Sequence, residues 1–118
     1  GNNIVVFDYI RPEIVPGILN KQIATVLKAV RDKFQIDLEL EEDSQAWNVL
    51  HQHALENLPF GGRGIGNVVE KYLINPLASV LTVQNWISDH RYVVTEIQES
   101  PAGIRVAVRQ LDSKEKNR

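Results

Sequence analysis

The chain has 118 residues, of which 43 % are hydrophobic and 24 % are charged, as expected of one globular domain. Its net charge of −2 lacks the basic excess that nucleic acids and anionic membranes attract, and no apolar run approaches the roughly 20 residues of a membrane span. The absence of cysteine excludes disulfides, thiol nucleophiles and thiolate metal sites. Because the first residues also lack the features of a signal peptide, we expect a cytoplasmic protein that binds neither nucleic acid nor membrane.

The first third of the sequence predicts a strand, a helix and a second strand. Residues 4–7 form a short apolar run typical of a buried strand, and a chain that begins in this way resembles a piece of a longer protein. A helix is expected from about Pro16 onward, because apolar residues then recur at helical spacing, at Leu19, Ile23, Val26, Leu27, Val30 and Phe34. Residues 36–40 alternate apolar and acidic side chains, which indicates a half-exposed strand.

Two further helices are predicted in the middle of the chain. One begins near residues 41–44, with Asp43 or Ser44 as its N-cap, and ends before Pro59. The next spans residues 65–81, where the amphipathic pattern is the best in the sequence. Pro76 lies inside this second pattern and should kink the helix, because proline removes one backbone hydrogen bond.

The last third predicts a linker, two strands and a polar tail. The linker, residues 82–90, contains Trp86, which is either a core residue or part of an apolar patch that a partner covers. Strands are predicted over residues 92–99 and 104–110, with a connection short enough for a hairpin. Residues 112–118 contain no apolar side chain, which predicts a disordered tail after a domain formed by residues 1–111.

These elements predict an α/β fold of the α+β type. Three main helices should pack on one face of a small mixed sheet of three to four strands that ends in a C-terminal hairpin. On the last strand, Ile104, Val106 and Val108 should face the helices, and Leu77 should lie in the core.

The glycine-rich stretch over residues 61–67 holds a single arginine, Arg63, and opens the third predicted helix. A helix start has backbone N–H groups without partners and carries partial positive charge, and Gly62 and Gly64 would let an anion approach that backbone. Arg63 adds a permanent cation, so the stretch is a candidate phosphate sensor. The alternative is a plain turn that requires positive φ, with Arg63 solvated.

Other chemical motifs are missing from the sequence. It contains no Gly-x-Ser-x-Gly elbow, no His-Glu-x-x-His pair and no phosphate-binding Gly-x-x-x-x-Gly-Lys-Ser/Thr loop. His51 and His53 are two positions apart and point to different faces of a helix, so no metal site is predicted. The chain therefore has no predicted catalytic residue and should not hydrolyse ATP by itself.

Three features, covering nearly the whole chain, resemble the small C-terminal domain of the second ATPase module in ClpB/Clp-type AAA+ unfoldases. Residues 4–7 resemble that family's opening Val-Val-Phe strand, and Pro12 follows as the family's proline does. Gly62-Arg63 stands where the family has Gly-Ala-Arg-Pro-Leu, although Gly64-Ile65 replaces Pro-Leu. Residues 75–78, twelve positions after the arginine, match the family's Asn-Pro-Leu-Ala.

The resemblance implies a function. Arg63 would be the sensor-two arginine, which reaches the phosphates of ATP or ADP bound mainly by the large ATPase domain of the same chain. Gly62 and Gly64 would form its supporting turn, and no metal would bind in this domain. The other implied partners are neighbouring subunits of a ring, commonly a hexamer, and the resemblance leaves open whether a protease also binds. The alternative is a small α/β protein-interaction module with no nucleotide role.

Overall fold

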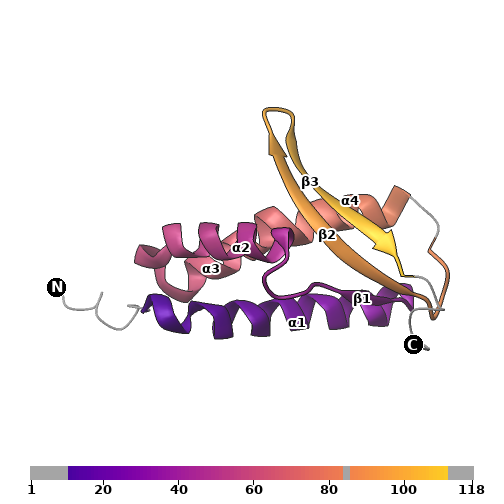
Figure 1. Cartoon of the computed structure of the whole chain (residues 1–118), viewed down its shortest axis with the longest axis horizontal. Coiled ribbons are helices and arrows are strands. Elements are labelled where there is room, and N and C mark those ends of the chain that lie inside the picture. Colours follow the sequence, from indigo (N-terminus) through magenta and orange to yellow (C-terminus); the bar gives the residue numbers. More distant parts are fainter. Residues whose placement is uncertain (1–10, 84–85, 112–118) are drawn as a thin grey trace.

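The computed structural model of the protein describes residues 11–83 and 86–111, which form three principal helical stretches and a mixed three-stranded sheet (Figure 1). In chain order the elements are the 3-10 turn η2 (Pro12–Ile14), helix α1 (Val15–Phe34), strand β1 (Asp37–Glu39), helix α2 (Gln45–Glu56), the 3-10 turn η3 (Leu58–Phe60), helix α3 (Gly61–Val69), the π-helical segment η4 (Glu70–Ile74), helix α4 (Asn75–Val83), and strands β2 (Arg91–Ser100) and β3 (Gly103–Gln110). The predicted fold class is confirmed. The strand predicted at residues 4–7 and the tail predicted at residues 112–118 lie outside the described residues.

The sheet has the strand order β1-β2-β3 and buries one of its faces against the helices. β1 runs parallel to β2, whereas β2 and β3 form the predicted antiparallel hairpin, in which Ile97 lies opposite Val106. These two side chains are buried, while Glu96 and Arg105 on the other face are exposed. Each strand packs against a different helix. α1 contacts β1, α2 contacts β2 and α4 contacts β3. As predicted, Ile104 and Val108 also pack against the core.

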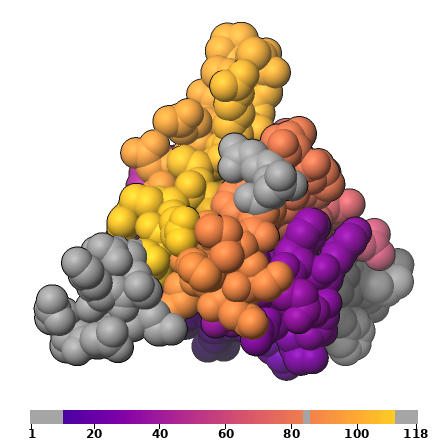
Figure 2. Space-filling view, turned by 90° about the vertical axis from the view of Figure 1, so that its right-hand side faces the viewer, coloured from indigo at the N-terminus to yellow at the C-terminus, as the bar shows by residue number. Residues whose placement is uncertain are grey.

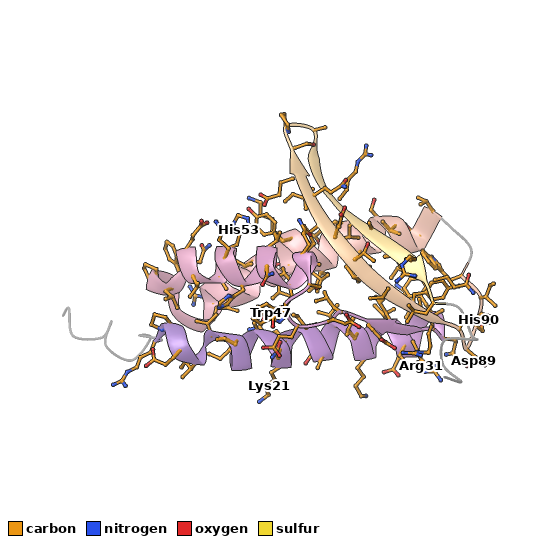
Figure 3. All side chains as sticks on the ribbon, viewed as in Figure 1. Lys21, Arg31, Trp47, His53, Asp89 and His90 are labelled. Atoms are coloured by element: carbon orange, nitrogen blue, oxygen red, sulfur yellow. The ribbon has the colours of Figure 1, made fainter. Side chains whose placement is uncertain are left out.

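Helix α2 is fixed at its start by a cap and along its length by a buried tryptophan. The Ser44 hydroxyl accepts a hydrogen bond from the Trp47 backbone N–H at 3.2 Å, so Ser44 rather than Asp43 is the N-cap. Trp47 projects from α2 toward α1 (Figure 3). Its indole Nε1 donates to Asn20 Oδ1 at 2.7 Å, so the buried ring keeps its polar group satisfied.

The third helical stretch begins at Gly61 and continues to Val83, which corrects the predicted start at residue 65. It changes to π geometry over η4, where the Asn75 N–H donates to the Glu70 carbonyl five residues earlier. Pro76 follows immediately and has no N–H, and in a regular helix its ring would collide with the carbonyl four residues back. The irregularity that proline predicts therefore takes the form of a π turn.

Trp86 lies between the end of α4 and the start of β2. Its ring is half-buried and meets the Tyr92 ring edge-on, with 4.9 Å between the centroids. Its Nε1 donates to the Leu81 carbonyl at 3.1 Å, which ties the linker to α4. Of the two predicted roles of Trp86, the structure supports packing against the core. Over the part of the chain that the structure describes, none of the helices combines the length and apolarity needed to cross a bilayer.

Candidate functional site

The candidate site lies where the chain leaves α2 and enters α3. Helix α2 ends at Glu56. Its C-cap is Asn57, whose side-chain Nδ2 donates to the His53 carbonyl at 2.7 Å. The Asn57 carbonyl in turn accepts the Phe60 N–H at 3.0 Å, which closes the short turn η3. These bonds satisfy backbone groups at the end of α2 and fix the direction in which α3 starts.

Gly61 makes the change of direction between η3 and α3. Its φ of 65° and ψ of −151° are accessible to glycine and costly for residues with a Cβ atom. The positive φ expected of a Gly-Gly turn thus falls on Gly61. Gly62 and Gly64 lie in the first turn of α3 itself rather than in a loop before it.

Gly64 has a different role from the other glycines, because α3 packs very closely on the preceding turn at this position. A Cβ atom placed on Gly64 would lie 2.5 Å from the Asn57 carbonyl oxygen and 3.0 Å from Phe60 Cβ. Real Cβ atoms essentially never come that close to a carbonyl oxygen. Glycine therefore stands in a place where this chain has no room for a side chain.

Arg63 is exposed in the same first turn of α3. That turn holds no acidic residue, so nothing within it neutralises the partial positive charge of the helix start. Within residues 11–83 and 86–111, no carboxylate forms an ion pair with Arg63. The guanidinium and the helix start thus add their positive charges at one exposed place.

Phe60 lies three positions before Arg63 and was not predicted from the sequence as a surface residue. It precedes α3 directly, and 66 % of it is exposed, which is unusual for a large aromatic side chain. The sequence signal was an aromatic residue between Pro59 and Gly61, two residues typical of turns. The candidate site therefore combines an apolar group with a cation.

The two histidines of α2 have different neighbours, as expected of residues that point to different faces of a helix. The His51 ring lies against Trp47, with 4.8 Å between centroids. The His53 ring stacks on Tyr72 at 4.0 Å, and its Nε2 lies 2.9 Å from Glu99 Oε2 of β2. In the described part of the chain, no group of three or more potential ligand residues is arranged to hold a metal ion.

Two hollows lie away from Arg63. A groove of about 330 Å³ runs between α1 and α4, with Val26, Phe34 and Leu77 among its lining residues. A hollow of about 220 Å³ lies between α4 and β3. Arg63 lines neither of them.

Comparison with models of known protein families finds no match for this chain, and comparison with curated proteins finds none either. A function for the chain must therefore be argued from its own residues. The start of α3, with Arg63 and the glycines around it, is the candidate site that the sequence and the geometry describe together.

Proposed function

We propose that this chain is the nucleotide-sensing small C-terminal domain of a cytoplasmic Clp/ClpB-like AAA+ ATPase. Arg63 contacts the phosphates of ATP or ADP that the large ATPase domain of the same longer chain holds. The small domain also contacts neighbouring subunits of a ring, commonly a hexamer, and a protease is a further partner that the proposal does not require. In this arrangement the domain couples the nucleotide state to protein unfolding by the whole assembly.

One observation carries the proposal, namely the position of Arg63 in the first turn of α3. The side chain is exposed, and no carboxylate of residues 11–83 or 86–111 pairs with it. The planar guanidinium can donate two parallel hydrogen bonds to phosphate oxygens, and such charge-assisted bonds are stronger than neutral ones. The acid-free helix start adds favourable charge for the same anion.

The packing behind Arg63 supports a coupling role. α3 continues through η4 into α4 as one helical stretch, and its buried side chains Ile65, Leu73 and Leu77 belong to the core. A force on Arg63 therefore acts on the core and on the sheet packed against it. When the γ-phosphate is lost, the bond to Arg63 is lost with it, and the domain can rotate as a rigid body.

The second candidate function is a small α/β protein-interaction module without a nucleotide role. The observation that favours it is the apolar groove between α1 and α4, which lies away from Arg63. The two functions differ in one respect that can be measured. Only the first requires the charge of Arg63 for ATP turnover.

The test is the rate of ATP hydrolysis by the longer protein that carries this domain. Arg63→Ala should lower turnover at least about tenfold, because a charge-assisted phosphate contact is lost. Arg63→Lys should recover part of the rate, since lysine keeps the charge without the planar fork. Lys21→Ala, which removes an exposed charge from α1, is the matched control and should retain the rate. Turnover of Arg63→Ala at the wild-type rate would leave the interaction module as the better proposal.

The ring supplies a second test. We expect the isolated chain to sediment as a monomer or weak dimer, because the large domains are needed to close a ring. A stable hexamer of this chain alone would contradict that part of the proposal.

A further inference from the structure

The outer edge of β3 is the longer of the two strand edges that stay unpaired in the described part of the sheet. Within residues 11–83 and 86–111, β3 pairs with β2 on one side and with no strand on the other. The edge is eight residues long, and unpaired edges of that length are templates for another strand. The turn end of the hairpin also projects beyond the helices (Figures 1 and 2).

The hydrogen bonds of the hairpin indicate which residues of β3 face this free edge. The Leu111 N–H donates to the Arg91 carbonyl at 2.9 Å, and the Ala107 carbonyl accepts from Thr95 Oγ1 at 3.3 Å. Odd-numbered residues of β3 thus direct their backbone polar groups toward β2. Since these groups alternate along a strand, the even-numbered residues direct theirs toward the free edge.

A hollow lies beside this edge and can receive side chains. It measures about 220 Å³. Its mostly apolar lining consists of Pro76, Ser79, Val80 and Val83 of α4 and Ile104, Arg105 and Val106 of β3. Val83 is 75 % exposed, so this wall is open to solvent. No residue of β2 lines the hollow, which places it at the outer side of β3. A strand laid along β3 would direct every second side chain toward this apolar space.

The opposite face of the same edge carries positive charge. Arg105 and Arg109 are exposed on β3, and within the described residues neither forms an ion pair. Of the two acids on β2, Glu96 instead accepts a hydrogen bond from Gln98 at 3.0 Å, and Glu99 lies 2.9 Å from His53. The remaining side chains of an added strand would lie beside these two arginines, where acidic residues are favoured.

We propose that the free edge of β3 binds an extended peptide segment of another protein in which apolar and acidic residues alternate. The backbone of the segment pairs with Ile104, Val106 and Val108, its apolar side chains enter the hollow beside α4, and its acidic side chains contact Arg105 and Arg109. Strand addition to a sheet edge beside a helix is a known mode of peptide recognition. The site does not involve Arg63, so it is independent of the nucleotide-sensing function.

The chain contains one segment of this pattern, residues 36–40, but a second copy is not the favoured occupant. Asp37 already lies 3.1 Å from Arg31, and Glu39 accepts from Arg91 Nε at 2.8 Å. Both acids are therefore engaged within their own subunit. A second copy would have to break these pairs in order to reach Arg105 and Arg109.

Fluorescence polarisation with the full 118-residue chain tests the proposal. The probe is a labelled, end-blocked peptide, Ser-Val-Glu-Val-Glu-Val-Glu-Ser, which should bind saturably. The double variant Arg105→Glu, Arg109→Glu should bind it at least about tenfold more weakly, because two ion pairs become repulsive. The matched control, Lys21→Glu with Lys28→Glu on α1, makes the same change in net charge and should keep the wild-type affinity.

Backbone pairing is tested with two probes that are N-methylated at alternate residues. Only one of the two sets of amides faces β3, so one methylated peptide should lose binding and the other should keep it. The proposal is overturned if the unmodified probe does not bind below about 1 mM, if both methylated peptides bind, or if the α1 control loses as much affinity as the β3 variant. A dimer that disappears in the β3 variant would assign the edge to a second copy instead.

Discussion

The side-chain amide of Gln45 pairs with the backbone of Ile97 as a neighbouring strand would. Gln45 Nε2 donates to the Ile97 carbonyl at 2.9 Å, and Gln45 Oε1 accepts the Ile97 N–H at 2.8 Å. β1 pairs with β2 only as far as Val93, so this amide takes over the backbone of β2 beyond the end of β1. One edge of the hairpin is thus covered by a side chain, whereas the outer edge of β3 is not.

Gln45→Ala should destabilise the fold by about 1–3 kcal/mol, because it leaves a partly buried N–H and C=O without partners. Gln52→Ala, which changes an exposed glutamine of the same helix, is the matched control and should change stability by less than about 0.5 kcal/mol. Urea unfolding of the two variants measures the difference. Equal stability of the two would mean that water replaces the Gln45 amide at no cost.

Gly64 and Gly66 of α3 should respond in opposite directions to alanine. Gly64→Ala should cost about 1–3 kcal/mol, because the added Cβ atom would lie 2.5 Å from the Asn57 carbonyl oxygen. Gly66→Ala meets only Gln22 Oε1 at 3.7 Å, and should stabilise the helix by up to about 1 kcal/mol. Thermal melting of both variants provides the comparison. A Gly64→Ala protein as stable as the wild type would refute the close approach of α3 to its preceding turn.

Leu77→Ala should destabilise the protein by about 2–5 kcal/mol, because its side chain is 2 % exposed and fills the core between α4 and its neighbours. Val83→Ala removes apolar atoms from the same helix at a position that is 75 % exposed, and should cost less than about 0.5 kcal/mol. Chemical denaturation with both variants separates core packing from helix propensity. A cost below about 1 kcal/mol for Leu77→Ala would contradict the position of this side chain in the core.

Arg63→Ala should leave the stability of this chain within about 0.5 kcal/mol of the wild type, because an exposed arginine without an ion pair in the described residues contributes little to folding. The isolated chain should also show no ATP turnover and at most weak ATP binding, since one arginine and a helix start cannot replace a phosphate-binding loop. Thermal melting and titration calorimetry measure the two quantities. A large drop in melting temperature would make Arg63 a structural residue, and micromolar ATP binding would reveal a complete site in this chain.

The candidate site was predictable in part from local sequence. A glycine cluster with one arginine at the start of an amphipathic pattern points to a helix start, and Arg63 is exposed in the first turn of α3. The separate tasks of the glycines were not predictable. Gly61 adopts a positive φ and Gly64 makes a close approach to Asn57, and the second depends on how closely α3 packs on the turn before it.

The sequence by itself determined the main elements of this protein, because their buried faces repeat with the period of a helix or a strand. Apolar spacing located α1 and α2, and the alternation over residues 104–108 located the buried face of β3. These patterns are local, since each residue's place follows from its near neighbours in the chain. The α+β class followed from the order of such elements.

Only the tertiary structure decided which distant groups meet. Gln45 and Ile97 are 52 positions apart, and no local pattern shows that an amide will complete the edge of a strand. The parallel pairing of β1 with β2 and the free edge of β3 likewise depend on how α2, α3 and α4 return the chain to the sheet. The physical reason is that these contacts join residues far apart in the sequence and form only when the core is packed. Such contacts leave no periodic signal in the sequence.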